Sequence, residues 1–230
     1  MKAHGEARAT PTGPRIVPAA RRIGEFLLWL VFDGYFTTHV SGLDNVPEEA
    51  VATLVAANHV SSLDVFAAGH AVKRPGFFLA KREATEIPLF GPFLKGLGAI
   101  PAERDGRDMQ AVKDMLKVLE RGHLLGVAPE GTRSPDGRMQ PFDPGFVWLA
   151  ARTGAVIVPC AIHNSWALMP KNAPYPKPGP LWVRFGPARS IDDRRPDADK
   201  SAAIANAVRR DIESMLRDLV RETGRPNPAV

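Results

Sequence analysis

Short apolar runs alternate with amphipathic stretches along most of this sequence, and this alternation limits the folds open to the chain. The apolar runs, which are typical of buried strands, lie at residues 51–57, 76–80, 98–102, 124–128, 155–162 and 182–185. Amphipathic stretches, in which apolar residues recur at helical spacing, lie at residues 62–72, 107–121 and 198–221. Strands that alternate with helices predict an α/β fold, here a mixed, largely parallel sheet flanked by helices.

The N-terminal part of the chain has a different character. Residues 1–18 are rich in Ala, Pro, Gly and Arg without apolar periodicity, which is typical of a flexible basic arm. Between residues 21 and 40, in a stretch that Gly34 interrupts, apolar residues recur at helical spacing: Ile23, Phe26, Leu27, Leu30 and Val31. Basic residues before such a stretch fit a helix that lies in a membrane interface, although a helix packed on the protein's own core has the same spacing.

We therefore predict two regions. Residues 1–42 would form the basic arm and an N-terminal helical membrane-associating segment, and residues 43–230 would form the α/β domain. No apolar run reaches the roughly 18 residues that a membrane-spanning helix needs. Membrane contact would therefore be peripheral or monotopic.

Charge and cysteine content narrow the classes of function. The 30 Lys and Arg residues outnumber the 25 Asp and Glu residues, which suits an anionic membrane, a phosphorylated substrate or nucleic acid. A nucleic-acid partner is not predicted, because no basic stripe with interleaved aromatic residues is present. Cys160 is the only cysteine, which excludes an internal disulfide and Cys-rich metal sites. No metal or bound cofactor is predicted.

The sequence NHVSSLD at residues 58–64 directly follows a predicted buried strand, where α/β proteins place their ligands. His59 is a candidate general base, because an imidazole can accept a proton near neutral pH. Asp64 lies five residues later, so a turn into a helix would bring its carboxylate back to the imidazole. Alternatively, Ser61 caps this helix and Asp64 is the capping-box acid; both roles are compatible only if Asp64 shares its oxygens.

The sequence PEGTRS at residues 129–134 also follows a predicted strand. Gly131 permits a tight turn that would direct Glu130, Thr132 and Arg133 to the same edge of the sheet. The forked guanidinium of Arg133 suits a phosphate. Taken alone, the motif is more typical of an ordinary polar turn.

Two further segments stand at predicted strands. Arg104 ends the sequence GAIPAER and is a second candidate phosphate donor, although a single Arg after a strand is often a solvated surface charge. Pro159 lies in the apolar run VPCAI, which predicts that it sits at the edge or the end of a core strand.

Taken together and in this order, these four blocks resemble the lysophospholipid acyltransferase family, typified by 1-acyl-sn-glycerol-3-phosphate acyltransferases. The family's NHxxxxD block is matched by Asn58, His59 and Asp64, and its PEGTRS block is matched residue for residue. Arg104 matches the Arg that ends the second block, and the VP-containing strand of the fourth block is matched as well. The resemblance covers about residues 44–186.

The resemblance implies transfer of a fatty acyl group from acyl-CoA or acyl carrier protein to the free hydroxyl of a lysophospholipid, above all 1-acylglycerol-3-phosphate, which gives phosphatidic acid. His59 would be the general base and Asp64 would orient it, in a direct transfer without a covalent relay. The thioester is a co-substrate, so no cofactor is implied. The enzyme would work at the cytoplasmic face of the cell membrane, on anionic lipids. The resemblance assigns substrate binding to Asn58, Arg104, Glu130, Gly131, Thr132 and Arg133.

One departure from the family pattern concerns the acceptor. Where members often carry a Lys in an F-K-x-G pattern, this chain has Asp143, whose charge would repel a phosphate. An acceptor of a different charge, such as a lyso-aminolipid, is the first alternative. The others are a thioesterase, in which His59 activates water, and a catalytically silent lipid-binding protein.

Overall fold

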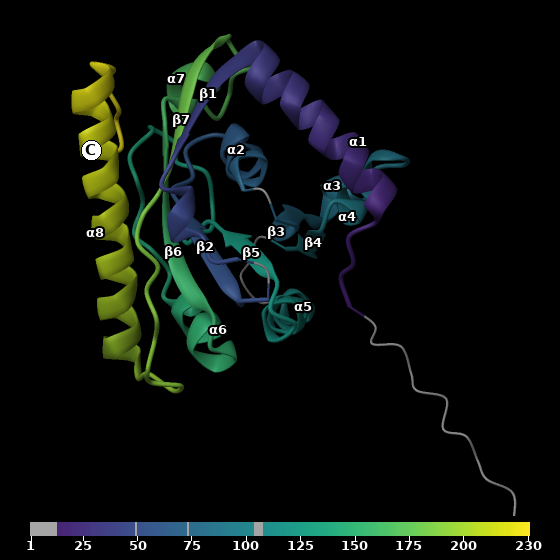
Figure 1. The fold of residues 1–230 in the computed structure, drawn as a ribbon, viewed down its shortest axis with the longest axis vertical. Coiled ribbons are helices and arrows are strands. Elements are labelled where there is room, and N and C mark those ends of the chain that lie inside the picture. The colour runs from purple at the N-terminus through teal and green to yellow at the C-terminus, as the bar shows by residue number, and fades with distance from the viewer. Residues whose placement is uncertain (1–12, 49, 73, 104–107) are drawn as a thin grey trace, which may run out of the picture.

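Seven strands form one sheet in the computed structural model, which describes residues 13–48, 50–72, 74–103 and 108–230 (Figure 1). Their order across the sheet is β1-β7-β6-β2-β5-β3-β4, and every neighbouring pair is parallel except β6 and β7. The predicted mixed, largely parallel sheet is confirmed. The strands are β1 (Phe36–Ser41), β2 (Thr53–Ala57), β3 (Gly76–Lys81), β4 (Ala99–Ala102), β5 (Leu124–Val127), β6 (Val156–His163) and β7 (Gly179–Phe185).

Helices cover both faces of the sheet, because side chains along a strand point alternately to the two sides. Leu54 and Ala56 of β2 join a core that α5, α6 and α8 cover, and Val55 and Ala57 join a core on the other face that includes α2. Figure 1 shows α8 along one side of the sheet and α1 and α2 on the other. The helices are α1 (Pro18–Trp29), α2 (Leu63–Ala71), α3 (Arg82–Glu86), α4 (Phe90–Gly96), α5 (Met109–Glu120), α6 (Gly145–Thr153), α7 (Ser165–Leu168) and α8 (Ala198–Thr223), with a π-helical segment η1 (Leu30–Tyr35) and a 3-10 turn η2 (Leu43–Asn45).

Helix α8 is capped at both ends and buries one stripe. The Asp197 carboxylate accepts a hydrogen bond from the Lys200 backbone N–H at 2.8 Å, and Gly224 ends the helix in the left-handed conformation. The inward side chains pack on the core that β6 shares: Val208, Ile212, Leu216 and Leu219. The predicted amphipathic helix thus buries its apolar stripe.

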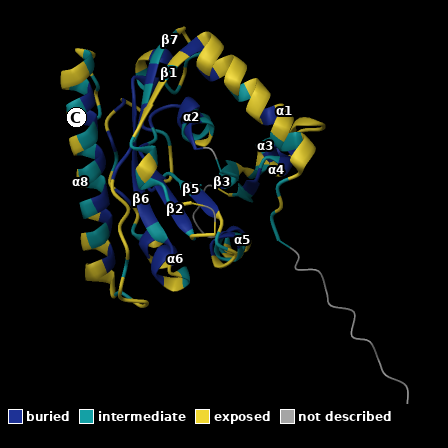
Figure 2. Ribbon diagram, in the orientation of Figure 1, coloured by how far each residue is buried: buried dark blue, intermediate teal, exposed yellow. Residues whose placement is uncertain are grey.

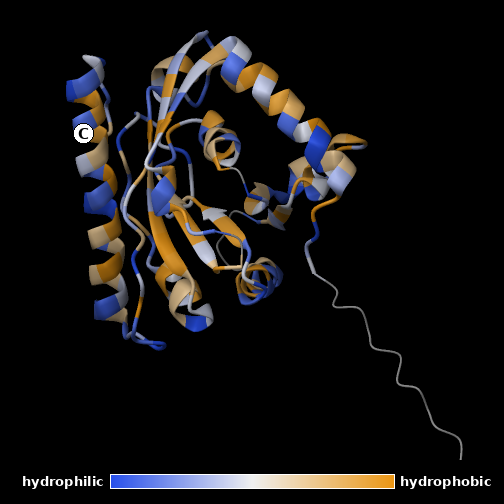
Figure 3. Ribbon diagram, in the orientation of Figure 1, coloured by the Kyte–Doolittle hydropathy of each residue, from blue (hydrophilic) through white to orange (hydrophobic). Residues whose placement is uncertain are grey.

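Helix α1 packs on α4 through a narrow contact between small residues. A Cβ atom on Gly24 would lie 2.3 Å from Leu97 Cδ2, and one on Gly96 would lie 2.7 Å from the Ala20 Cβ, so both glycines permit this close approach. The other side of α1 is exposed and largely hydrophobic (Figure 2, Figure 3). No helix among the described residues is long and apolar enough to cross a membrane. The exposed apolar side chains are Ile23, Phe26, Leu27 and Trp29 of α1 and Leu30, the first residue of η1.

Strand β1 corrects two predictions about the N-terminal region. The periodicity predicts helical structure as far as residue 40, but residues 36–41 form a strand that pairs with β7. Threonines and a valine favour the extended chain there, and only Phe36 is buried. A boundary between residues 42 and 43 would separate β1 from the sheet, so the α/β unit begins at Phe36.

Pro159 lies inside the interior strand β6 and not at a strand edge or end. Its carbonyl oxygen accepts a hydrogen bond from the Gly186 N–H at 2.8 Å. In an extended strand the N and the C=O of one residue point to the same side, so the Pro159 nitrogen points toward β7 and away from β2. At this level β7 has already ended, at Phe185, so no β7 residue needs a donor there. The absent N–H therefore removes no bond between β6 and β2, which explains why the sheet tolerates this proline.

Candidate active site

Asn58 fixes the start of the loop between β2 and α2. It is fully buried, its Nδ2 donates to the Ile162 carbonyl oxygen at 3.1 Å, and its Oδ1 accepts from the Ile162 N–H at 2.8 Å. A side-chain amide can satisfy both backbone groups of one residue because it carries a donor and an acceptor. This pair of bonds ties the end of β2 to β6, so the geometry gives Asn58 a positioning role, and direct substrate contact by Asn58 stays a prediction.

His59 and Asp64 meet as their spacing predicts. The His59 Nδ1 lies 3.3 Å from Asp64 Oδ2, and the two side chains are 18% and 2% exposed. The same Oδ2 accepts the backbone N–H groups of Val60 at 2.8 Å and Ser61 at 2.7 Å. Asp64 therefore orients the imidazole and accepts the Ser61 N–H with the same oxygen. The alternative role of Ser61 as the helix cap is wrong, because Ser62 precedes α2 and no side-chain hydrogen bond among the described residues caps the helix.

The tautomer of His59 follows from this contact. Because the Asp64 carboxylate is an acceptor, Nδ1 carries the proton and Nε2 keeps its lone pair. The second carboxylate oxygen, Oδ1, is buried and has no hydrogen-bond partner among the described residues. Because no donor in the described part of the chain binds Oδ1, the charge of the Asp64 carboxylate can stabilise an imidazolium next to it.

Glu130 connects the PEGTRS loop to the backbone of the histidine loop. Its Oε1 accepts the His59 N–H at 2.6 Å and its Oε2 accepts the Gln140 N–H at 2.8 Å. The Ser134 N–H, in turn, donates to the His59 carbonyl oxygen at 2.9 Å. Burial raises the pKa of Glu130 to about 7, although the two N–H donors act in the opposite direction. Glu130 thus holds His59 in place through its main chain.

The other PEGTRS residues lie around the first turn of α2. Gly131 has a φ of +68°, a conformation that suits glycine, and Thr132 is exposed. Arg133 is half-buried, and its Nη1 donates to the Ser62 hydroxyl at 2.7 Å. Ser62 lies three residues after His59, so Arg133 is bonded to the loop that carries the candidate base.

Two cations lie near the ends of β3 and β4 in the sequence. Arg104 lies outside the described residues, so its predicted phosphate contact stays a prediction. Lys81 ends β3 and is exposed, although no motif marks it in the sequence. A cation directly after a strand is the only signal that could have found it. The neighbouring Arg82 forms ion pairs with Glu103 at 2.9 Å and with Asp108, so its charge is already balanced within the protein.

Asp143 has a local structural role. Its Oδ1 accepts the Gly145 N–H at 2.7 Å at the start of α6, and its own N–H donates to the Pro129 carbonyl oxygen at 2.9 Å. A short acidic side chain is favoured at such a helix start. This role explains an Asp where the resemblance leads us to expect a Lys.

Cys160 and His163 are not candidates for the chemistry. Cys160 is fully buried, and burial raises the pKa of its thiol. Burial lowers the pKa of His163 to about 4, and its ring nitrogens contact Thr223 Oγ1 at 3.1 Å and Asn227 Nδ2 at 2.9 Å. His163 is therefore a neutral side chain that ties β6 to the C-terminal segment.

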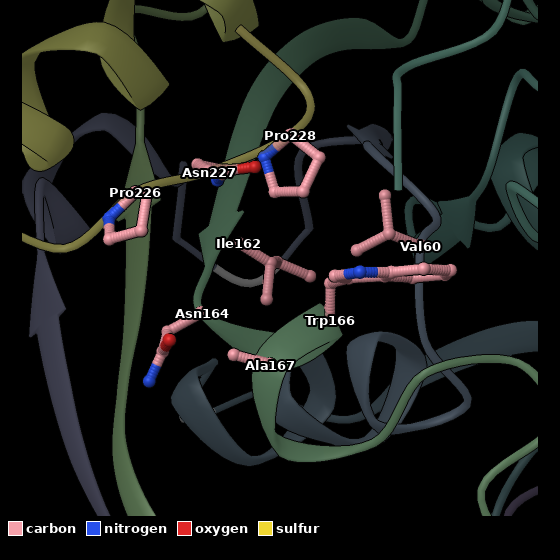
Figure 4. Close-up of a pocket in the computed structure, with 8 residues that line it drawn as sticks. All are labelled: Val60, Ile162, Asn164, Trp166, Ala167, Pro226, Asn227 and Pro228. Atoms are coloured by element: carbon pink, nitrogen blue, oxygen red, sulfur yellow. The ribbon is translucent and has the colours of Figure 1, made fainter. Parts of the chain in front are cut away.

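A small cavity lies beside this segment (Figure 4). It has a volume of about 10 Å³, which is room for about one water molecule, so it is not a substrate site. No group of three metal-ligating side chains occurs among the described residues. The cavity is lined by Val60, Ile162, Asn164, Trp166, Ala167, Pro226, Asn227 and Pro228.

The sequence profile of the Acyltransferase family matches residues 37–163, which is more than half of the chain, and the chain belongs to this family. It is 33% identical over 184 residues to a 1-acyl-sn-glycerol-3-phosphate acyltransferase of Pseudomonas aeruginosa, with 75% of this chain and 67% of the relative covered. A chloroplast enzyme of the same name from Brassica napus is 31% identical over 141 residues, which cover 59% of this chain and 40% of the relative.

A solved structure supports the fold. The crystal structure of the 1-acyl-sn-glycerophosphate acyltransferase PlsC from Thermotoga maritima aligns with a TM-score of 0.72 and 24% identity, over 87% of this chain and 78% of that one. The chain spans less than half the length of the chloroplast relatives from Brassica napus and Arabidopsis thaliana that it matches.

Proposed function

We propose that this protein transfers a fatty acyl group from an acyl thioester to the hydroxyl of 1-acylglycerol-3-phosphate, which gives phosphatidic acid. The observation that carries the proposal is the His59–Asp64 pair at 3.3 Å, at the carboxyl end of β2. The names of the relatives from Pseudomonas aeruginosa and Brassica napus support this acceptor.

The reaction needs one base and no covalent relay. His59 Nε2 takes the proton of the acceptor hydroxyl while that oxygen attacks the thioester carbonyl. The tetrahedral intermediate collapses and expels the thiolate of CoA or acyl carrier protein, which receives the proton from the imidazolium. Asp64 stabilises the imidazolium between these steps. The nearby Ser61 hydroxyl is not the nucleophile of the proposal, since it donates to the Met169 carbonyl oxygen at 2.7 Å.

The acceptor phosphate would be held by Arg133 together with Arg104. The Arg133 guanidinium is charged at all relevant pH values and can bind a phosphate with two parallel hydrogen bonds. Its contact with Ser62 supports the placement of that charge beside the loop that carries the base. Gly131 and Thr132 would let the loop backbone approach the substrate, and Asn58 and Glu130 would act by positioning the two loops.

The acceptor is a lipid, so the enzyme would work at a membrane. The exposed apolar side of α1 supports contact with the cytoplasmic face of the cell membrane, and Arg21 and Arg22 favour anionic lipids there. The segment η1 connects this helix to the site, because Asp33 Oδ2 lies 3.1 Å from His70 Nε2 and the Phe32 ring stacks on that imidazole. His70 lies on α2, the helix whose first turn carries Asp64.

The test is thiol release from acyl-CoA and from acyl carrier protein donors in mixed micelles. Purified protein is assayed with lysophosphatidic acid, with a lyso-aminolipid, and without acceptor. We expect release that needs lysophosphatidic acid, that falls at least ~100-fold in His59→Ala, and that is unchanged in the control His39→Ala, an exposed histidine of β1.

The other outcomes would replace the proposal. Release only with the lyso-aminolipid would keep the mechanism and change the substrate. Equal release without acceptor would identify a thioesterase, and no release from either donor would leave a lipid-binding protein.

A further inference from the structure

The turn between α3 and α4 exposes an apolar side chain in a strained backbone. Leu89 has a φ of +65° and a ψ of −47°, and the Phe90 N–H donates to the Pro88 carbonyl oxygen at 2.8 Å. These features define a γ-turn of the rare kind with positive φ at its centre. Leu89 is 90% exposed, more than any other large hydrophobic side chain among the described residues.

A leucine at this position is unfavourable in two ways. A residue with a side chain is strained at such a φ, a strain that glycine avoids and that asparagine bears more easily. An apolar side chain in water also forgoes the stabilisation that burial would contribute. Strain of this kind indicates a function that is served by the outward position of the Leu89 side chain.

The turn leads into α4, which packs against α1. The Val17 N–H donates to the Gly96 carbonyl oxygen at 2.8 Å, and the glycine contacts described above hold α4 against α1. Figures 2 and 3 show the α3–α4 turn, exposed and hydrophobic, protruding beside α1. Ile87 and Phe90 are exposed on either side of Leu89. The turn and α1 are therefore two exposed apolar segments, far apart in the sequence, that the contact between α4 and α1 brings close together.

The composition of these two segments fits a lipid layer. Phe26 and Trp29 stack at a centroid distance of 6.2 Å on the exposed side of α1, and aromatic rings are favoured at membrane interfaces. Arg22 and Lys95 are exposed and form no ion pair within the described part of the chain, which favours anionic head groups. Glu86, beside the turn, would remain at head-group level.

We propose that the turn at residues 87–90 is a second membrane anchor, whose Leu89 side chain enters the acyl layer next to α1. This inference rests on the proposed membrane association of α1. Helix α3 begins directly after the carboxyl end of β3, the sheet edge from which the candidate active-site loops also leave. Two separate contacts fix the tilt of the protein on the membrane, which one helix alone cannot do, and so set the distance of His59 from the lipid surface.

The first experiment locates the turn. Leu89→Cys is labelled with an environment-sensitive fluorophore, and Val51→Cys, an exposed apolar position next to the amino end of β2, is the matched control. Cys160 is fully buried and leaves the introduced thiol as the accessible one. Protein bound to phosphatidylcholine–phosphatidylglycerol vesicles is then quenched by nitroxides placed on the acyl chains. We expect quenching at position 89 and none at position 51. An unquenched label at position 89 on bound protein, or no binding to vesicles, would overturn the proposal.

The second experiment separates the anchor from the chemistry. Leu89→Asn removes the apolar side chain while it tolerates the positive φ, so thermal stability should be unchanged or slightly higher. We expect several-fold weaker vesicle binding and several-fold slower acylation of lysophosphatidic acid embedded in vesicles, with an unchanged rate in detergent micelles. An equal loss in micelles would refute an anchoring role. Absence of micelle activity in the unsubstituted protein would refute the proposed function and leave the quenching result to decide on the anchor.

Discussion

Helices α1 and α8 carry the same kind of sequence pattern and end in opposite environments. In α8, Ile212 and Leu216 are 0% exposed, because the helix lies on the core that β6 shares. In α1, Phe26 is 58% exposed and Trp29 is 54% exposed. Apolar periodicity thus predicts a helix and its apolar face, whereas the partner that covers this face is decided by the rest of the fold.

The inward side of α1 explains the difference. It touches α4 through Gly24 and Ala20, and contacts between such small residues occupy little of the helix surface. Leu28 packs on the core that includes α2, whereas Phe26 and Trp29 keep about half of their surface exposed in the folded chain. Transfer of this exposed apolar surface from water to an apolar layer is available for binding.

The largest expected effect is a difference in stability between matched leucine substitutions. Leu216→Ala in α8 opens a cavity in the core and should lower the free energy of unfolding by about 2–5 kcal/mol. Leu27→Ala in α1 removes a side chain that is 45% exposed and should change it by less than about 0.5 kcal/mol. Urea denaturation of both variants measures the two values. Equal losses would mean that the exposed side of α1 is covered within the protein itself.

The next effect concerns pH, because burial raises the pKa of Glu130 in the site, whereas the hydrogen bond with Arg184 lowers the pKa of Glu222 in α8. A carboxyl group whose pKa is raised from 4.5 to about 7 by folding contributes its stability in full below about pH 4.5 and loses it as the pH rises through 7. Between pH 5 and 8 the unfolding free energy should fall by on the order of 2 kcal/mol relative to Glu130→Gln.

Denaturation midpoints of both proteins across this pH range measure the effect, with Glu120→Gln, an exposed carboxylate of α5, as control. Curves for the unsubstituted protein and Glu130→Gln that run parallel with pH would show that Glu130 stays ionised in the fold.

A smaller effect is expected at the caps. Asp197→Ala removes the side-chain cap of α8 and should cost about 1 kcal/mol, because a backbone N–H at the helix start loses its acceptor. The loss is measured by thermal denaturation. The control is Asp199→Ala, which lies two residues later in the first turn of α8 and removes no cap bond. If both variants lose the same stability, the cap bond contributes nothing.

The smallest effect should be a gain in α1. Val17 occupies its N-cap without a side-chain hydrogen bond, so Val17→Asp should add about 0.5 kcal/mol if α1 folds with the rest of the chain. Denaturation in the absence of lipid tests this change. If α1 forms only on a membrane, the substitution would leave the free energy of unfolding unchanged. Helix α8, in contrast, forms with the core of the protein.

The sequence predicts the elements of this fold better than their arrangement. The alternation of strands and helices is confirmed, as is the amphipathic helix at the C-terminal end. The reversed direction of β7 is not predicted, because it follows from the connection after β6, which holds only the short helix α7 and a loop. Helix α6 is missed as well, since Pro144 and Gly145 suggest a break where the helix begins.

The candidate site shows the same limit. The five-residue spacing of His59 and Asp64 suffices to predict their contact, because a loop and one helical turn determine it. The bond from the His59 N–H to Glu130 joins residues 71 positions apart and requires β2 and β5 to be neighbours in the sheet. No local pattern encodes that adjacency, so the supporting role of Glu130 becomes visible only in three dimensions.

The pairing of β1 with β7 has a consequence for synthesis of the chain. Phe36 pairs with Gly179, so β1 has no partner among the described strands until nearly all of the sheet has left the ribosome. At about 5–20 residues per second, α1 is translated roughly 10–30 s before its neighbouring strand can be fixed. During that interval an apolar helix is available to chaperones or to a nearby bilayer. The order of translation therefore leaves α1 without the completed sheet until nearly the whole chain has been made.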